Sequence, residues 1–393
     1  MTAPPGPALP GPAPIGPART GPTPVDPAGA GPGEWLAVHI FYAANPQPLL
    51  VQCIGPLVEE LTADGLLAGH FFINYWLEGP HVRLRLRPAD PSLAGTVRDR
   101  AEAAITAFLR RRPALYEMGH GYLGELYNTL FALEYPAGPP PELLGPDGLM
   151  LLQPNNSYGF RRYEPEYGKY GGPAGVALAE WHFQQSSELV VQAMRTMNLH
   201  MRPILFGVAA QLMMVQAGCF LRAPAAGPLA DPLVGPRVDR DAVAGFLDRY
   251  HHFWHRAFAG TNFIGTAEYQ RQYDALAPAL RRRWESTVDA LDSAQTARLP
   301  GFLRGWAAHC IELRARVVAL AGAGELLLDR HDGAGPVPVT DPDTALDTLL
   351  SPYLHMTNNR FHVTIRDEAY LSYVLGRALR DSSELPAVAG GVR

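Results

Sequence analysis

The sequence predicts an α+β fold, with one helix-rich domain over residues 34–385, an antiparallel sheet and a disordered Pro-rich N-terminal tail over residues 1–33. Residues 81–87 alternate strictly between polar and apolar side chains, which is typical of a strand. Long stretches of the second half space their apolar residues as helices do. The tail holds 11 of the 38 prolines and seven glycines, and has no run of bulky apolar residues with which to build a core.

The elements follow one another as short strands first and long helices later. The predicted strands cover residues 35–42, 70–76 and 81–87, and a turn at residues 78–80 joins the last two into a hairpin. The predicted helices cover residues 48–68, 90–112, 175–218, 240–258, 266–290 and 303–322. The second should be capped by Asp90 or Ser92, and the third should break or bend near Pro203. Pro- and Gly-rich connections at residues 134–147, 223–236 and 332–342 are too short to mark a domain boundary.

Composition limits the functional classes. Hydrophobic residues make up 47% of the chain and charged residues 18%, which is typical of a soluble globular protein. A formal net charge of −5 argues against general binding to nucleic acid or to a membrane surface. Neither a signal peptide nor a run of apolar residues long enough to span a membrane is visible. Three widely spaced cysteines fit a reducing compartment, so we expect a cytoplasmic protein.

The strand over residues 81–87 carries the strongest functional signal. Its polar face presents His81, Arg83, Arg85 and Arg87, so that like charges lie about 7 Å apart. Such an arrangement favours an anion lying across the strand, because guanidinium groups bind carboxylates and phosphates in a bidentate manner. A solvated face paired with nearby Asp and Glu side chains is the alternative.

Two further segments combine charged and aromatic residues. Residues 158–172 are dense in Tyr, Arg, Lys and Glu and end in Gly171-Gly172, which permits close backbone approach before a helix. The alternative is a well-packed turn with its charges paired locally. If residues 351–361 are helical, His355 and Asn359 share a face and Arg360 lies close to it. His355 is then either a general acid or base or a structural histidine.

One pattern suggests a metal. His251 and His255 stand four residues apart in a predicted helix, as metal ligands can. No third ligand with suitable spacing follows, so we expect neither a metal nor another cofactor.

The three segments together resemble a known family. They are similar to the C-terminal domain of class I lantibiotic dehydratases, which also occurs as a free-standing thiopeptide-type bacteriocin biosynthesis protein. The matching motifs are Gly79-Pro80-His81-Val82-Arg83-Leu84-Arg85, Tyr163-Glu164-Pro165-Glu166 with Tyr170-Gly171-Gly172, and His355-Met356-Thr357-Asn358-Asn359-Arg360. The resemblance runs from about Trp35 to Leu379. Asn74 stands where the family's first strand usually has Arg, and residues 134–147 form a Pro-rich insertion.

The resemblance implies that the protein modifies a ribosomally made precursor peptide. In the dehydratases, a large N-terminal region attaches glutamate to Ser or Thr, and the C-terminal domain eliminates it to leave a dehydroamino acid. The reading that we favour from the sequence is this elimination, catalysed by a lyase. Because the chain has nothing like the glutamylation region, the implied partners are the precursor peptide and a separate glutamylation-type dehydratase subunit. A homodimer is compatible with the resemblance.

The resemblance also suggests roles for individual residues. Arg83 and Arg85 would hold the glutamyl carboxylates, and His355 would move the proton. The other expected substrate-binding residues are His81, Arg87, Arg162, Tyr163, Glu166, Lys169, Asn359 and Arg360. We expect all three segments to converge on one pocket, with His355 within about 15 Å of the Arg83 side chain, since direct proton transfer requires still closer contact.

Two alternatives remain open. Thiopeptide pyridine synthases share the fold that the resemblance implies, and they join two dehydroalanines in a formal [4+2] cycloaddition and expel the leader peptide. The protein could instead be a catalytically silent subunit that presents the precursor peptide to another enzyme.

Overall fold

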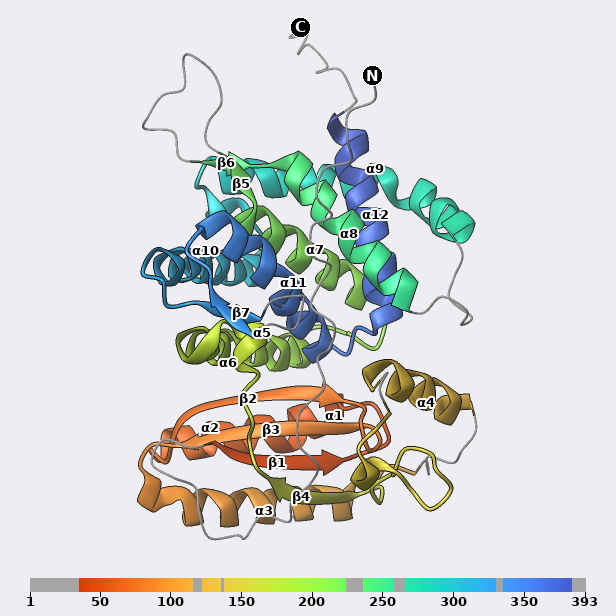
Figure 1. Cartoon of the computed structure of the whole chain (residues 1–393), viewed down its shortest axis with the longest axis vertical. Coiled ribbons are helices and arrows are strands. Elements are labelled where there is room, and N and C mark those ends of the chain that lie inside the picture. The colour runs from red at the N-terminus through yellow and green to blue at the C-terminus, as the bar shows by residue number, and fades with distance from the viewer. Residues whose placement is uncertain are drawn as a thin grey trace, which may run out of the picture. The chain divides into compact units, whose positions relative to one another are not determined.

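A computed structural model describes residues 35–115, 122–135, 138–223, 236–257, 266–329 and 335–383. These residues form the α+β fold that the sequence predicts, in which a small antiparallel sheet is combined with many helices (Figure 1). The predicted disordered tail, residues 1–33, lies outside the described residues, as do parts of the three Pro- and Gly-rich connections.

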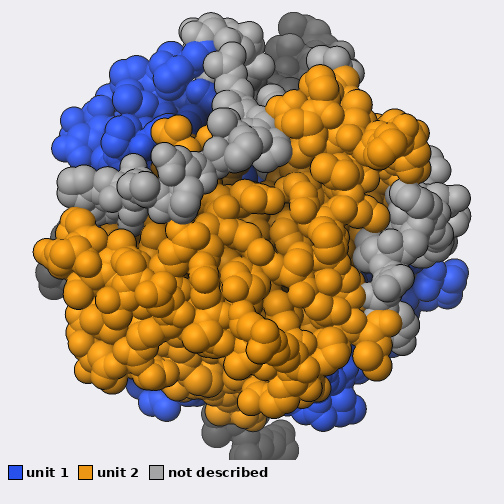
Figure 2. All heavy atoms as spheres, turned by 90° about the horizontal axis from the view of Figure 1, so that it is seen from below, with its two compact units in different colours: residues 1–14, 167–179, 198–393 blue, residues 15–166, 180–197 orange. Residues whose placement is uncertain are grey.

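The chain divides into two compact units, which Figure 2 draws in two colours. The sheet unit comprises the described residues within 35–166 and 180–197. The helical unit comprises those within 167–179 and 198–383. Helix α6 (Gly172–Thr196) contributes residues to both units. The limits of the single domain predicted over residues 34–385 stay a prediction.

The sheet unit combines four strands with helices. The strands are β1 (Leu36–Phe41), β2 (Leu67–Tyr75), β3 (His81–Pro88) and β4 (Ser157–Arg161). The helical segments are α1 (Gln47–Leu49), the π-helical η1 (Leu50–Ile54), α2 (Gly55–Ala63), η2 (Pro91–Leu93), α3 (Ala94–Arg111), α4 (Tyr122–Glu134) and η3 (Pro141–Leu143).

The sheet has the order β2-β3-β1-β4, and every pair is antiparallel. The predicted hairpin of β2 and β3 is confirmed, with Tyr75 opposite His81. Its turn places Glu78 at φ 65° and Gly79 at φ 105°, a left-handed pair that suits the twist of a tight hairpin. Because β3 is a central strand, both of its edges are paired.

One face of the sheet packs on helices. Val82, Leu84 and Leu86 of β3 are buried on this face. They alternate with the polar residues of the strand, as the sequence predicts. Helix α3 contacts β1 and β3 and buries residues at helical spacing: Val97, Ala101, Ile105 and Phe108. Each large apolar side chain buried here contributes about 1.5–3 kcal/mol, so this core holds the other face of β3 in place.

Two predicted helices differ from the observed ones. The helix predicted to reach residue 68 ends at Ala63, because Gly65 adopts φ 68° and the chain then enters β2. The long helix predicted over residues 175–218 is two helices, α6 and α7 (Arg202–Phe220). Pro203 stands in the first turn of α7, where its missing N–H removes no helical hydrogen bond.

Seven further helical segments and two short strand pairs complete the helical unit. The helical segments are α5 (Tyr167–Tyr170), α8 (Arg240–Ala257), α9 (Thr266–Asp292), η4 (Thr296–Arg298), α10 (Gly301–Gly322), α11 (Pro342–Arg360) and α12 (Ile365–Ser383). The strand pairs are β5 (Arg222–Ala223) with β6 (Arg237–Val238), and β7 (Leu327–Asp329) with β8 (Pro336–Pro338).

Helix α7 is the core helix of this unit. It packs against α9, α10 and α11, and its residues from Val208 to Phe220 are nearly all buried. Among the described helices it alone is long and apolar enough to cross a membrane, but 67% of its apolar window is buried inside the protein. Such burial is the usual condition of the central helix of a helical core.

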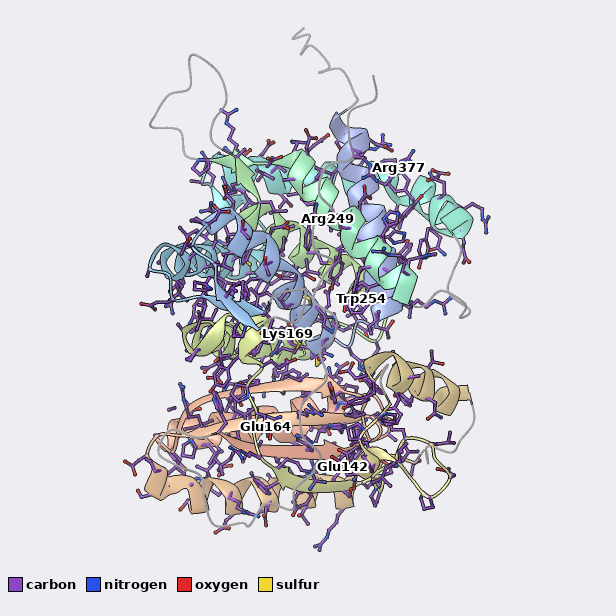
Figure 3. The ribbon with its side chains drawn as sticks, in the orientation of Figure 1. Glu142, Glu164, Lys169, Arg249, Trp254 and Arg377 are labelled. Atoms are coloured by element: carbon purple, nitrogen blue, oxygen red, sulfur yellow. The ribbon has the colours of Figure 1, made fainter. Side chains whose placement is uncertain are left out.

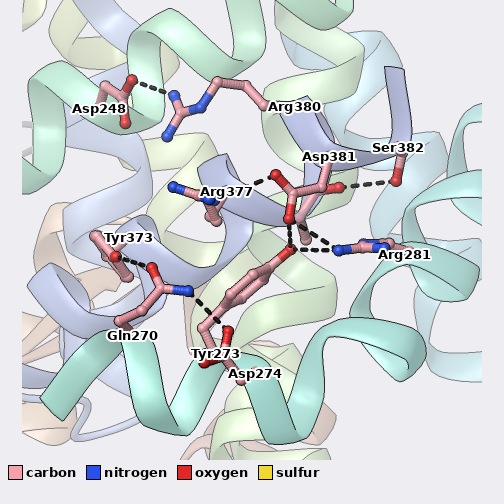
Figure 4. A network of polar contacts seen from close by, with 11 residues as sticks. Asp248, Gln270, Tyr273, Asp274, Arg281, Tyr373, Arg377, Arg380, Asp381 and Ser382 are labelled. Atoms are coloured by element: carbon pink, nitrogen blue, oxygen red, sulfur yellow. Dashed lines mark hydrogen bonds and ion pairs between the residues drawn. The ribbon is translucent and has the colours of Figure 1, made fainter. Parts of the chain in front are cut away.

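Helix α12 is held by polar contacts along its last turns (Figure 4). Asp381 accepts hydrogen bonds from the Tyr273 hydroxyl (2.6 Å) and from Arg281 (2.8 Å), both on α9. Arg377 forms a further ion pair with the same carboxylate at 3.2 Å. The indole N–H of Trp284 donates to the carbonyl of Leu375 at 3.1 Å. These contacts fix α12 against α9.

Candidate functional site

The polar face of β3 and its neighbours form a cationic cluster. We call His39, His81, Arg83, Arg85 and Arg161 the arginine cluster. The strand register places His39 opposite Arg83. Ala37 of β1 pairs with Arg85 on one neighbouring strand and with Arg161 on the other. Arg83 donates from Nε to Nε2 of His81 at 3.1 Å, and His81 Nδ1 lies 2.8 Å from the carbonyl of Gly79. This pattern assigns the proton of His81 to Nδ1.

Arg85 is the most deeply buried cation of the cluster, with 5% of its surface exposed. Its guanidinium lies 3.4 Å from His39 Nε2 and 3.4 Å from the carbonyl of Leu84, while its Nε has no hydrogen-bond partner. Burial, with the nearby charge of Arg83, lowers the pKa of Arg85 to about 9, so the group remains cationic at neutral pH. Among the described residues, no Asp or Glu forms an ion pair with Arg83 or Arg85.

Both imidazoles of the cluster are neutral at neutral pH. Burial, followed by the charges of Arg83 and Arg85, holds the pKa of His39 well below its usual value. Burial and Arg83 do the same to the pKa of His81, against the opposing hydrogen bond to Gly79. Because His39 Nε2 faces the Arg85 donor, its proton lies on Nδ1, and that atom is buried without a partner. The cluster therefore presents two unpaired donors beside a buried positive charge.

Aromatic rings, in place of carboxylates, support the guanidinium groups. Arg83 lies 3.5 Å from the ring centroid of Tyr75, Arg85 lies 5.3 Å from that of Tyr163, and Arg87 lies 5.0 Å from that of Trp35. These are cation–π contacts. The interpretation of this strand as a solvated, salt-bridged face is therefore wrong for Arg85, whose side chain is buried among rings and imidazoles.

Arg87 differs because a carboxylate lies nearby. The pKa of Glu180, on α6, is raised by burial, while hydrogen bonds from Tyr163 and Trp35 and the charge of Arg87 act in the opposite direction. Glu180 was not among the residues predicted from the sequence, and neither were Trp35, His39 and Arg161. Tyr163 contacts both Arg85 and Glu180, which places this predicted residue beside the cluster.

The segment over residues 158–172 is spread over both units. Arg162 and Glu166 are exposed in the sheet unit, whereas Lys169 is half-buried on α5, with its Nζ 5.3 Å from the ring centroid of Tyr170 (Figure 3). Gly171 and Gly172 have φ of 96° and 75°. The carbonyl of Gly171 accepts from the N–H of Leu327 at 3.1 Å, and a Cβ on Gly172 would lie 3.1 Å from the Leu327 Cβ. The glycines thus allow close packing of β7, which favours the interpretation as a well-packed turn.

A second cluster forms around His355. Residues 351–360 are helical, which meets the condition under which His355 and Asn359 share a face of α11. His355 Nδ1 lies 2.9 Å from Glu368 Oε1 on α12, and Glu368 has no exposed surface. The hydroxyl of Tyr250, on α8, donates to the other oxygen of the same carboxylate. We call His355, Glu368 and Tyr250 the histidine cluster.

The turn between α11 and α12 brings these groups together. His362 adopts φ 60°, and the N–H of Val363 donates to the carbonyl of Asn358 at 3.0 Å, which ends α11. Thr364 and Asp367 then exchange hydrogen bonds between side chain and backbone, both at 3.2 Å, in a capping box that begins α12. Glu368 follows directly, so the cap sets its position.

The remaining predicted residues of the third motif lie at the end of α11. Asn359 is half-buried, and Arg360 is fully buried and donates to the carbonyl of Met356 at 2.7 Å. Their roles in substrate binding stay predictions. The predicted convergence of His355 with Arg83 also stays a prediction, because His355 belongs to the helical unit and Arg83 to the sheet unit.

The histidine pair on α8 forms a different kind of contact. His251 is buried, and its Nδ1 lies 2.8 Å from the carbonyl of Ala369. The ring centroids of His251 and His255 lie 5.6 Å apart. Over the ranges that the structure describes, no group of three or more His, Cys, Asp and Glu side chains is placed to hold a metal.

The fold is shared with two solved structures. One similar solved structure is the pyridine synthase TbtD from thiomuracin biosynthesis, with 19% identity and a TM-score of 0.64 over 88% of this chain and 98% of that chain. Another is TsrL, with 16% identity and a TM-score of 0.59 over 90% of this chain and 96% of that chain.

A third comparison gives a weaker likeness. The tRNA-dependent lantibiotic dehydratase MibB from Microbispora sp. 107891 has 21% identity and a TM-score of 0.48 over 91% of this chain and 29% of that chain. No curated protein matches the sequence. The family of the lantibiotic biosynthesis dehydratase C-terminal domain matches residues 35–379, the span over which the motifs show the resemblance, and the chain therefore belongs to this family.

Proposed function

We propose that the protein builds a pyridine ring in a ribosomally made precursor peptide by joining two dehydroalanines and expelling the leader peptide. One observation carries this proposal: the pyridine synthase TbtD is matched over 98% of its length by 88% of this chain. It supports the cycloaddition over the glutamate elimination that we favoured from the sequence. The reaction would take place in the cytoplasm, after a separate dehydratase has formed the dehydroalanines.

The chemistry of the ring requires proton transfers. Two dehydroalanines supply four ring carbons; the backbone nitrogen of one of them and the carbonyl carbon of the preceding residue complete the ring. The amide must first pass its N–H proton to its oxygen, which yields the N=C–OH form that can add to the second C=C bond. Loss of that hydroxyl as water and of the leader as an amide then gives the aromatic ring. The tautomerisation, the loss of water and the loss of the leader each move a proton to or from a nitrogen or an oxygen, and the two losses also take a proton from a ring carbon; the ring-forming addition itself moves none.

The histidine cluster suits this demand. An imidazole exchanges protons near neutral pH and is the commonest general acid and base in proteins. The side chain of His355 retains 19% of its exposure, and its other nitrogen is turned toward a buried carboxylate. We therefore assign the proton transfers at the amide and at the departing hydroxyl to His355.

The arginine cluster favours a second candidate, elimination of glutamate from glutamylated Ser or Thr. There a base removes the α-proton while the glutamyl carboxylate departs with the electron pair of its C–O bond. A departing anion is stabilised by preorganised donors in a water-poor site. Arg85, with its unpaired Nε, and His39, with its unpaired Nδ1, are donors of that kind.

One experiment distinguishes these functions. The purified protein is incubated with a leader-bearing precursor peptide, prepared once with dehydroalanines and once with glutamyl-serine esters, and the products are read by mass spectrometry. A pyridine synthase converts the first peptide with loss of water and release of the leader amide. Release of glutamate from the second peptide instead would establish elimination. Binding of both peptides without conversion would identify a peptide-binding subunit and contradict the proposal.

A further inference from the structure

We infer that Glu368 and Tyr250 position His355, holding its proton on Nδ1 so that Nε2 is left as the reactive base. Neither residue belongs to the motifs that mark the family resemblance. The inference deepens the proposed function and rests on it for the role of His355, but the arrangement of the three groups stands on their geometry.

The carboxylate is the centre of the arrangement. Glu368 is completely buried, and a buried carboxylate is costly unless hydrogen bonds or a cation compensate it. In the described part of the chain, no Lys or Arg forms an ion pair with Glu368. Its two oxygens instead have different partners. Oε1 lies 2.9 Å from His355 Nδ1, and Oε2 accepts a hydrogen bond from the Tyr250 hydroxyl. Each oxygen thus has one partner.

The direction of these hydrogen bonds determines the tautomer. An ionised carboxylate only accepts, so the proton between Glu368 and His355 belongs to Nδ1. The Tyr250 hydroxyl is the donor on the other side, because burial and the adjacent Glu368 charge raise the pKa of Tyr250 well above its usual value. Neutral His355 therefore carries its free electron pair on Nε2. This is the tautomer that a carboxylate imposes in hydrolytic triads.

Packing holds the imidazole in place without sealing it. Trp254 lies on α8 (Figure 3), and its ring centroid lies 5.2 Å from that of His355 at an interplanar angle of 39°. The side chain of His355 is nevertheless 19% exposed. Glu368 on α12 and Trp254 on α8 thus orient the His355 side chain, which solvent can still reach.

A second histidine of the same unit provides a contrast. His251 is 3% exposed, and its Nδ1 lies against the backbone carbonyl of Ala369, one residue after Glu368. Such a histidine needs no ionisable partner to satisfy its ring. His355, by comparison, combines a buried carboxylate with partial accessibility, and this combination is what acid–base chemistry requires.

The test compares Glu368→Gln with Tyr250→Phe. In the Gln variant the Tyr250 hydroxyl retains the amide oxygen, so the NH₂ group faces His355 Nδ1 and forces the proton onto Nε2. We expect turnover of the dehydroalanine peptide to fall about 10³- to 10⁴-fold, as an incorrect tautomer costs in a triad. Tyr250→Phe removes one hydrogen bond but keeps the tautomer, so we expect about a 2- to 10-fold loss. Glu368→Asp should recover part of the activity that the Gln variant loses.

The tautomer of His355 is the measurement that a purely structural role of Glu368 would not change. Nitrogen-15 NMR of histidine-labelled protein, with the His355 signals identified by their absence in His355→Ala, reports which ring nitrogen carries the proton. The inference requires Nδ1–H in the wild type and Nε2–H in Glu368→Gln. Nε2–H in the wild type, or loss of activity in Glu368→Gln with Nδ1–H retained, would overturn it.

The outcome remains informative if a variant does not fold, because the wild-type tautomer alone can contradict the inference. The tautomer measurement also separates the inference about His355 from the proposed function. A wild-type enzyme that turns over neither peptide, but shows Nδ1–H and the switch in Glu368→Gln, would refute the proposed function and leave the positioning pair intact.

Discussion

The arginine cluster and the histidine cluster satisfy their buried charges in opposite ways. In the sheet unit, Arg85 is buried with no carboxylate paired to it among the described residues, and two donors of the cluster lack acceptors. In the helical unit, Glu368 is buried with no Lys or Arg of the described ranges paired to it, but both of its oxygens have partners.

This difference suits the arginine cluster to binding an anion and the histidine cluster to proton transfer. A buried cation with unpaired donors is stabilised when an acceptor of negative charge arrives, so the arginine cluster is suited to hold a carboxylate. A fully buried carboxylate whose two oxygens each accept a hydrogen bond from a side chain is closed to a ligand and instead fixes the groups around it. The following predictions test this division, in order of decreasing effect.

Removing the imidazole should have the largest effect. We expect His355→Ala to reduce turnover about 10³- to 10⁴-fold while the fold is retained, since general acid–base catalysis contributes up to about 10⁴-fold and removing the base costs at least as much as its incorrect tautomer. Mass spectrometry should show the unreacted dehydroalanine peptide accumulating. If a glutamylated peptide accumulates instead in a reconstituted pathway, His355 serves elimination.

The matched control is His252→Ala, an exposed histidine of α8 whose Nδ1 lies 2.7 Å from the carbonyl of Asp248. It should react at the wild-type rate. Normal product formation by His355→Ala would remove this residue from the catalytic site and refute the role that we assign to the histidine cluster.

Replacing the buried cation should separate activity from stability. Arg85→Met removes a desolvated charge but also the contact with Tyr163, so we expect a net gain of about 1 kcal/mol in the free energy of unfolding. Under the second candidate function, release of glutamate from the glutamylated peptide should nevertheless fall about 10²-fold, because a charge-assisted contact to the departing carboxylate is lost. Urea unfolding and the peptide assay measure the two effects.

A ligand sharpens this prediction. Added glutarate should raise the melting temperature of the wild type, since a ligand that binds the folded state stabilises it, and should leave Arg85→Met unchanged. Arg110→Met, at an exposed position of α3, is the control and should behave as the wild type in all three assays. A large loss of stability in Arg85→Met would show that the guanidinium is a structural partner of its neighbours.

Local patterns in the sequence predict much of the fold. Alternation identifies β3, and its turn residues identify the hairpin, because each depends on adjacent residues alone. Helix α12 was missed, although Thr364 and Asp367 form a capping box that could have indicated its start. Helix α4 was missed although the apolar residues in its 13-residue sequence recur every three to four positions, as on one face of a helix, and strand β4 was missed because its stretch of five residues is short.

Only part of each cluster could be predicted, for a related reason. The predicted part is three of the five residues of the arginine cluster (His81, Arg83 and Arg85) and one of the three of the histidine cluster (His355). Arg83 and Arg85 share a strand face, and His355 stands in a recognisable motif. His39 joins the arginine cluster only through the register of β1 with β3, which no local pattern reveals. Glu368 lies on a different helix from His355, so its contact depends on how α11 turns into α12.

Acidification should test the neutral imidazoles of the arginine cluster. Folding holds the pKa of His39 and of His81 below the value of about 6.5 in the unfolded chain, so below about pH 6.5 the unfolded chain binds protons that the folded chain does not. Stability should therefore fall as the pH decreases from about 6.5 to 5, by at most about 1.4 kcal/mol per pH unit for each imidazole.

Burial also lowers the pKa of His70, to about 4, so His70 contributes to the pH dependence of stability as well. Comparing the slopes of variants isolates the contribution of His39. His39→Gln should remove the part of the slope due to His39, and the exposed His252→Gln should not change it. Urea unfolding at several pH values measures both. Identical slopes in the wild type and His39→Gln would mean that His39 is protonated in the folded protein, and an imidazolium could not form the acceptor contact with Arg85.

The smallest effect is expected at the far end of α12, where Asp381 binds Tyr273, Arg281 and Arg377. Asp381→Asn should cost about 1 kcal/mol in the free energy of unfolding, because the network is partly exposed and solvent replaces much of what is lost. Glu312→Gln, which breaks a more exposed pair with Arg316, should have no measurable effect.

Because the capping box and Tyr250 fix Glu368 at the other end of the helix, Asp381→Asn should leave the His355 tautomer and the turnover unchanged. A changed tautomer in this variant would show that the whole of α12, and not the local cap, positions the carboxylate.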